Sequence, residues 1–87
     1  MLPLALRVLK ATEATLASTV EFDLPSAGYV HLDLYSVAGR KVRTLFQGER
    51  AAGSGRIALE RGDTARGIYL VQLRSPWGVR SERVLLR

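Results

Sequence analysis

Few residues of this sequence are of the types that carry out chemistry. The one histidine is His31, and there is no cysteine, so thiolate ligands, cysteine nucleophiles and disulfides are excluded. A nucleophile needs a neighbouring base, and His31 falls on the polar side of a predicted strand, where a surface histidine is expected. The eight acidic residues are scattered, whereas paired-carboxylate hydrolysis needs two that converge. We therefore expect no enzyme activity, metal site or cofactor.

Three weaker patterns resemble ligand sites, and each has a structural explanation. Glu60 and Asp63 fall in a turn-rich segment, but a calcium loop carries more oxygen ligands at alternate positions. The Gly-rich stretch at 53–55 lacks the lysine and the strand-to-helix setting of a phosphate loop. Trp77, in a predicted hairpin turn, is a candidate platform for a sugar ring, although we expect it to fold over the edge of its own domain.

The positive charge is concentrated in the second part of the chain. The net charge is +5, but residues 1–39 hold two basic and four acidic residues, a net charge of −2. Residues 40–87 hold eleven basic and four acidic residues, a net charge of +7. We interpret this excess as arginines on solvated strand faces. Because aromatic and basic residues do not interleave in a recognised motif, we expect no nucleic-acid partner.

The length of 87 residues fits one domain with one core. Hydrophobic residues make up 47% and charged residues 24%, which is typical of a folded domain. No basic residue precedes the apolar start at 1–6, so this start does not predict a signal peptide. No apolar run approaches the roughly 18 residues that span a bilayer. We expect residues 1–87 to be a single module excised from a larger exported protein.

Alternation of apolar and polar residues with period two is the dominant pattern, and no segment has a helical period. The sequence therefore predicts an all-β fold, an immunoglobulin-like antiparallel β-sandwich of about seven strands. The predicted strands are 4–8, 16–24, 29–35, 41–46, 56–60, 68–73 and 79–86.

Several local features refine this prediction. Residues 47–55 contain three glycines and are expected to form a long flexible connection. Residues 68–73 are almost entirely apolar, which predicts a central strand covered on both faces. In the fourth strand we expect Val42 to point inward together with Leu45 or Phe46, and a bulge would explain the change of phase.

Two stretches of the sequence, Leu-Tyr-Ser-Val-Ala-Gly-Arg-Lys-Val-Arg-Thr-Leu at 34–45 and Arg-Gly-Ile-Tyr-Leu-Val-Gln-Leu at 66–73, resemble a known family. They look like the carboxy-terminal sorting domain of proteins exported by the type IX secretion system, and like the related immunoglobulin-like domain of the flagellar hook-capping protein. The family's motifs occur in order from about residue 19 to residue 87. The matching structural positions are Gly39, Arg40, Leu45, Gly67, Tyr69 and Leu73.

These positions also have a physical interpretation of their own. Gly39 fits a hairpin turn that needs a positive φ, and Gly67 releases the chain into the central strand. Tyr69 is expected to bury its ring and to direct its hydroxyl to a backbone group at a corner of the sandwich. We expect most of these residues to build the fold.

The resemblance implies a non-catalytic module that the outer-membrane secretion machinery recognises. Such modules deliver covalently linked catalytic or adhesive domains, such as those of a hydrolase or adhesin, to the cell surface, and are often removed or exchanged for an anchor. The implied recognition residues lie in the last strand: Ser81, Glu82, Arg83, Val84, Leu85, Leu86 and Arg87. An edge strand of this kind can be recognised by strand addition.

Two other functions remain open at this point. An accessory carbohydrate- or ligand-binding module requires Trp77 to be exposed, with a second aromatic ring within reach. An inert spacer or assembly domain predicts that the terminal residues can be removed without loss of localisation.

Overall fold

The described part of the chain is built from β-strands alone. The structure is a computed structural model that describes residues 3–9 and 18–86. Its strands are β1 (Ala5–Leu9), β2 (Ser18–Leu24), β3 (Gly28–Ser36), β4 (Lys41–Arg50), β5 (Gly53–Leu59), β6 (Gly67–Ser75) and β7 (Gly78–Leu86). The predicted all-β fold with about seven strands is confirmed. The predicted start of the second strand, at 16–17, lies outside the described residues.

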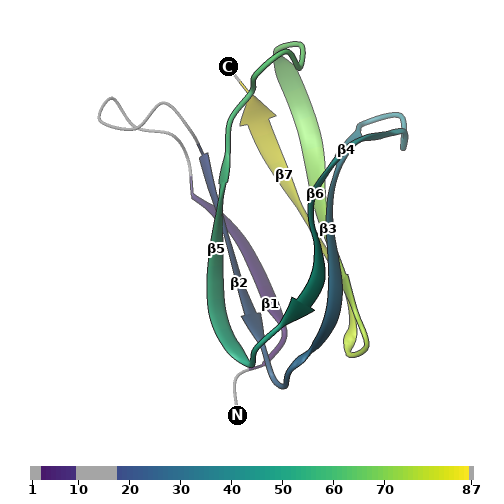
Figure 1. Cartoon of the computed structure of the whole chain (residues 1–87). Helices are drawn as coiled ribbons and strands as arrows, with labels where there is room; N and C mark the ends of the chain where they lie inside the picture. The colour runs from purple at the N-terminus through teal and green to yellow at the C-terminus, as the bar shows by residue number, and fades with distance from the viewer. Residues whose placement is uncertain (1–2, 10–17, 87) are drawn as a thin grey trace.

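The strands form two antiparallel sheets that face each other (Figure 1). One sheet has the order β1-β2-β5 and the other the order β4-β3-β6-β7. In the constant-type immunoglobulin arrangement the fourth strand lies in the first sheet beside the fifth. Here β4 pairs with β3 in the second sheet. The central place predicted for residues 68–73 is confirmed, because β6 lies between β3 and β7.

The core fills the space between the two sheets. Every second residue of a strand points inward, and the apolar residues at these positions in β2, β3 and β6 are at most 1% exposed. Burying one such aliphatic or aromatic side chain stabilises the fold by about 1.5–3 kcal/mol. The buried apolar residues are Leu6, Val20, Phe22, Leu24, Val30, Leu32, Leu34, Leu59, Val71, Leu73, Val84 and Leu86.

The turn between β3 and β4 depends on a glycine. Gly39 has a φ of 88°, which favours glycine because a Cβ is strained there. Its N–H donates to the Ser36 carbonyl at 3.0 Å, and the Ser36 N–H donates to the Arg40 carbonyl at 2.8 Å. The turn has the positive φ that the sequence predicted.

Tyr69 locks the loop that precedes β6. Its hydroxyl donates to the carbonyl oxygen of Ala65 at 2.6 Å, while the ring packs against the core. A tyrosine near the start of this strand that bonds to the backbone a few residues upstream is a hallmark of immunoglobulin-like sandwiches. The hydroxyl therefore has the backbone partner that the sequence predicted.

The long flexible connection predicted for residues 47–55 is wrong. Strand β4 continues to Arg50 and β5 begins at Gly53, so only two residues join them. Packing requires one of the three glycines of this segment. Gly55 is buried beneath Phe22, and a Cβ there would lie 2.5 Å from the Cζ of that ring.

Two bulges shape β4, as the change of phase in its sequence predicted. The register with β3 skips Leu45 and Val42, each of which is an extra residue in β4. Leu45 and Phe46 pack against the core. The inward orientation predicted for Val42 is wrong, because this side chain is 39% exposed at its bulge.

The prediction that both faces of β6 are covered is also wrong. Val71 and Leu73 are buried between the sheets, but Ile68 is 50% exposed on the opposite face. No strand of the described part packs over that face. The apolar run therefore reflects one buried face and one exposed apolar position.

The contact between Gly55 and Phe22 gives a stability prediction. Gly55→Ala places a methyl group against a ring that is 1% exposed, so we expect the free energy of unfolding to fall by about 1–3 kcal/mol. Urea denaturation followed by circular dichroism measures this change. Ala58→Ser, at an exposed site of the same strand, is the control and should change stability by no more than about 0.5 kcal/mol. Equal stability of Gly55→Ala and the parent would contradict the close packing.

Candidate functional site

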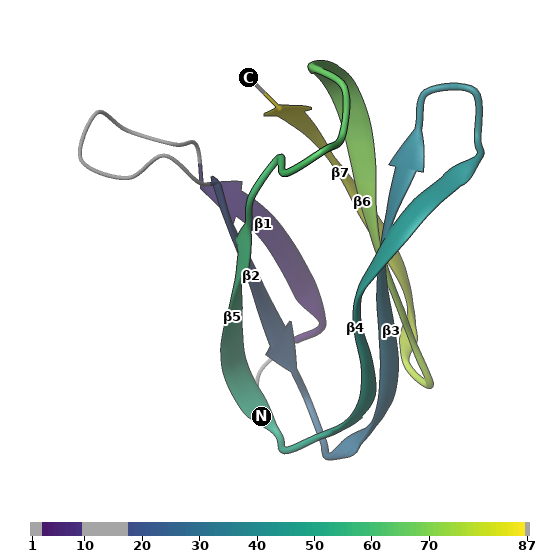
Figure 2. The same cartoon turned by 45° about the horizontal axis from the view of Figure 1, so that its top comes forward.

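The strand β7 forms one edge of the four-stranded sheet (Figure 2). It pairs with β6 over nine consecutive residues, from Gly78 opposite Ser75 to Leu86 opposite Gly67, without a register shift. Its other side pairs with no strand of the described part. β1 of the facing sheet comes close to β7, and the backbone groups of β7 that it leaves uncovered are free to pair with another polypeptide.

The predicted recognition residues divide into two sets along β7. Val84 and Leu86 point into the core and are 4% and 3% exposed. The other positions of the segment, Ser81, Glu82, Arg83 and Leu85, are exposed, and Arg87 lies outside the described residues. Because only the exposed set can contact a partner in the folded domain, Val84 and Leu86 serve the fold.

The exposed set continues into a small apolar patch on the outer face of the sheet. Leu85 lies directly opposite Ile68, and both side chains are about half exposed. The next pair on the same face joins Arg83 to Leu70. Paired residues on one face of a sheet are in contact. These four residues, Ile68, Leu70, Arg83 and Leu85, therefore lie side by side on the outer face.

The other edge strands are either shorter than β7 or interrupted by bulges. The bulges at Val42 and Leu45 interrupt β4, and bulges disrupt the pairing ladder of an edge. β1 has five residues and contacts β7 across the sandwich. β5 has seven residues. Within the described residues, β7 is the longest edge strand without a bulge.

Trp77 packs against its own domain. The indole ring lies against Gly28, where a Cβ would come within 2.8 Å of it, and it also contacts the core. In the described part of the chain, the one ring–ring contact joins Tyr29 to His31, at 5.2 Å between centroids. Trp77 therefore lacks the second aromatic ring that a stacking platform requires.

The residues of the family motif occupy structural positions. Gly39 and Arg40 form the turn after β3, Leu45 is a bulge residue of β4, and Gly67 begins β6. The last two, Tyr69 and Leu73, close the corner and fill the core. Apart from the exposed Arg40, none of them offers a freely exposed side chain to a partner.

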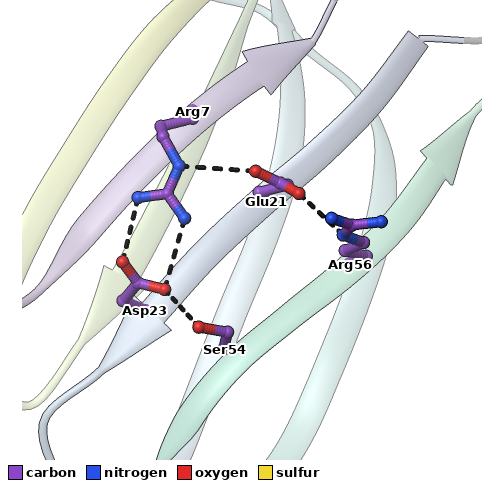
Figure 3. A network of polar contacts seen from close by, with 5 residues as sticks. All are labelled: Arg7, Glu21, Asp23, Ser54 and Arg56. Atoms are coloured by element: carbon purple, nitrogen blue, oxygen red, sulfur yellow. Dashed lines mark hydrogen bonds and ion pairs between the residues drawn. The ribbon is translucent and has the colours of Figure 1, made fainter. Parts of the chain in front are cut away.

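A network of ion pairs crosses the outer face of the three-stranded sheet (Figure 3). The Arg7 guanidinium donates to both carboxylate oxygens of Asp23, at 2.9 and 3.3 Å, and lies 3.4 Å from Glu21. Glu21 also pairs with Arg56 at 2.6 Å, and the Ser54 hydroxyl donates to Asp23 at 2.7 Å. These residues come from β1, β2 and β5, so the network ties all three strands together.

The network serves stability because its carboxylates are already paired. Hydrogen bonds from Arg7 and then Ser54 lower the pKa of the Asp23 carboxyl below its usual value. A carboxylate held in its ionised form by two donors is a weak base. The network was not predicted from the sequence. Its one signal was the opposite charge of Arg7 and Glu21 on neighbouring predicted strands, and only the register shows that they meet.

A second paired carboxylate lies in the outer face of the other sheet. Asp33 is 1% exposed, and its oxygens lie 3.5 Å from Arg74 and 3.6 Å from Lys41. The sequence placed Asp33 beside His31 on the polar side of β3. The strand has this orientation, but the long side chains of Arg74 and Lys41 cover the carboxylate.

Residues 3–9 and 18–86 contain no group of three or more histidine, aspartate or glutamate side chains placed to hold a metal ion. The same residues form no helix long and apolar enough to cross a membrane.

Comparison with known proteins adds no relative to this description. No protein-family model matches the chain, and no curated protein matches it. Arguments about its function therefore rest on its own residues.

The Asp23 interactions predict how stability depends on pH. A lowered pKa in the folded state adds stability that is complete above the unfolded value, about 3.9, and is lost as the pH falls through the folded value. Asp23→Asn should therefore be less stable than the parent at pH 7, and the difference should shrink steadily below pH about 4.

Urea midpoints measured between pH 7 and pH 2 check this prediction. Asp63→Asn, in the exposed turn before β6, controls for the loss of one negative charge. A stability difference between Asp23→Asn and the parent that is the same at pH 7 and pH 2 would show that the ionised carboxylate does not contribute.

Proposed function

We propose that this domain is the non-catalytic sorting and surface-attachment module of an exported bacterial protein, and that the outer-membrane type IX secretion machinery recognises it through β7. The single observation that carries the proposal is the regular, unpaired edge of β7 with its exposed side chains. The resemblance of residues 34–45 and 66–73 to type IX sorting domains supplies the kind of partner. The module's place of action is then the cell surface.

The structure of β7 supports recognition by strand addition. A partner strand can form main-chain hydrogen bonds along an unpaired edge, and alternate side chains then determine specificity. On the outer face these side chains are Leu85 and Arg83, next to the exposed Ile68. A partner strand with an apolar and an acidic residue at matching positions would complement them.

The same strand shows why simple truncation is a poor test. Removal of residues 81–87 deletes Val84 and Leu86 from the core, and leaves most of β6 without its partner. The loss of two buried aliphatic side chains costs about 3–6 kcal/mol, a large part of the stability of a small domain. A truncated domain would lose sorting simply because it unfolds.

Substitutions at exposed positions separate recognition from folding. The domain is fused to the C-terminus of an exported reporter in a bacterium with type IX secretion. Arg83→Glu combined with Leu85→Ser should leave the urea midpoint of the domain nearly unchanged. Surface delivery of the reporter should fall about tenfold, which corresponds to ~1.4 kcal/mol of lost recognition energy.

The matched control combines Arg66→Glu with Val37→Ser, which make the same kinds of change at exposed turn positions and should be delivered normally. Normal delivery of the β7 double variant would show that the secretion machinery does not recognise the exposed side chains of β7. If the intact fusion stays inside the cell, sorting itself is excluded in that host, and a structural spacer becomes the better interpretation. The packing of Trp77 leaves a carbohydrate-binding role without a supporting observation.

A further inference from the structure

A groove of about 260 Å³ lies between β4 and β5, at the opposite edge of the four-stranded sheet from β7. Its walls are residues 43–45 of β4 and residues 57–59 of β5, together with Glu60. Leu45 and Ile57 are partly buried and pack against the core. The groove therefore has an apolar floor and two strand edges as walls.

The groove exists because β4 and β5 belong to different sheets and diverge from a short corner (Figure 2). Near the corner, Arg50 fills the seam between the sheets. Its guanidinium lies 5.0 Å from the centre of the Phe22 ring and 5.1 Å from that of Phe46. Farther from the corner the groove begins, and residues of both strands line it.

Arg43 gives the groove an unpaired positive charge. One of its terminal nitrogens donates to the carbonyl oxygen of Glu60, but its Nε is buried and finds no acceptor among the described residues. Arg43 takes part in none of the ion pairs within 3–9 and 18–86. A carboxylate beside the guanidinium would supply the opposite charge.

The backbone of β5 offers the more regular of the two walls. β5 keeps an unbroken register with β2 over seven residue pairs, so its free side presents evenly placed donors and acceptors. The bulges at Val42 and Leu45 prevent β4 from doing the same. An incoming segment would therefore pair with β5.

We propose that this groove binds a short extended segment of a partner protein. The segment is apolar, adds to the free edge of β5 at 57–59, and carries a carboxylate that pairs with Arg43. This second site does not depend on the sorting function, because it lies between β4 and β5 and uses no residue of β7. The Glu60 carboxylate, the one acidic group that lines the groove, weakens the attraction and tunes the affinity.

The proposal is tested with two capped tetrapeptides as probes, valine-leucine-valine-glutamate and the same peptide with glutamine in place of glutamate. Each is titrated into the isotope-labelled domain, and the backbone amide resonances are followed by NMR. We expect shifts at Leu45, Ile57 and Ala58, and binding of the glutamate peptide about fivefold tighter than that of the glutamine peptide. Arg43→Gln should abolish this preference, and Glu60→Gln should increase it.

Arg80→Gln, in the β6–β7 hairpin away from the groove, is the control and should leave both affinities unchanged. Arg43→Lys keeps the charge without the planar donors and should retain part of the preference, provided that circular dichroism shows an intact fold. Equal affinity for the two peptides, or shifts confined to β7, would overturn the proposal. So would dimerisation of the free domain through the same residues, because the groove would then bind a second copy.

Discussion

The structure depends on one packing constraint: the apolar faces of β3 and β6 must lie against those of β2 and β5. Val30, Leu34 and Val71 are all completely buried in the middle of this contact. Once these residues point inward, the alternation of side chains sets the orientation of the remaining residues in their strands. Strand pairing then sets the orientation of the side chains in β4 and β7. The inward orientation of Val84 and the outward orientation of Leu85 follow from this contact.

The two edges of the four-stranded sheet differ because the chain continues differently after each edge strand. β4 must bend into the corner that leads to β5, and its bulges at Val42 and Leu45 allow this while disrupting its pairing edge. β7 continues to no further strand of the described part, so it stays regular and unpaired. One edge thus offers a ladder for strand addition, and the other offers a groove.

Part of the charge of this domain contributes to its own stability. Arg56 and Arg74, counted in the basic excess of residues 40–87, pair with carboxylates on the two outer faces. Such partly exposed pairs contribute modestly one by one, but the Arg7–Asp23 network joins three strands. Arg43 and Arg83 take part in no ion pair of the described residues, and they lie at the two surfaces for which we propose partners.

The sequence alone determined the features that depend on neighbouring residues. The period of two determined the strands, and Gly39 the turn after β3. Tyr69 could be assigned its backbone hydrogen bond because the partner, Ala65, is only four residues away. What tertiary structure decided depends on segments far apart in the chain. Gly55 joins a strand because Phe22 occupies the place of its side chain, and the recognition segment divides at Val84 and Leu85 because β6 sets its register. The groove beside Arg43 exists only because two sheets diverge, and such geometry leaves no local pattern in a sequence.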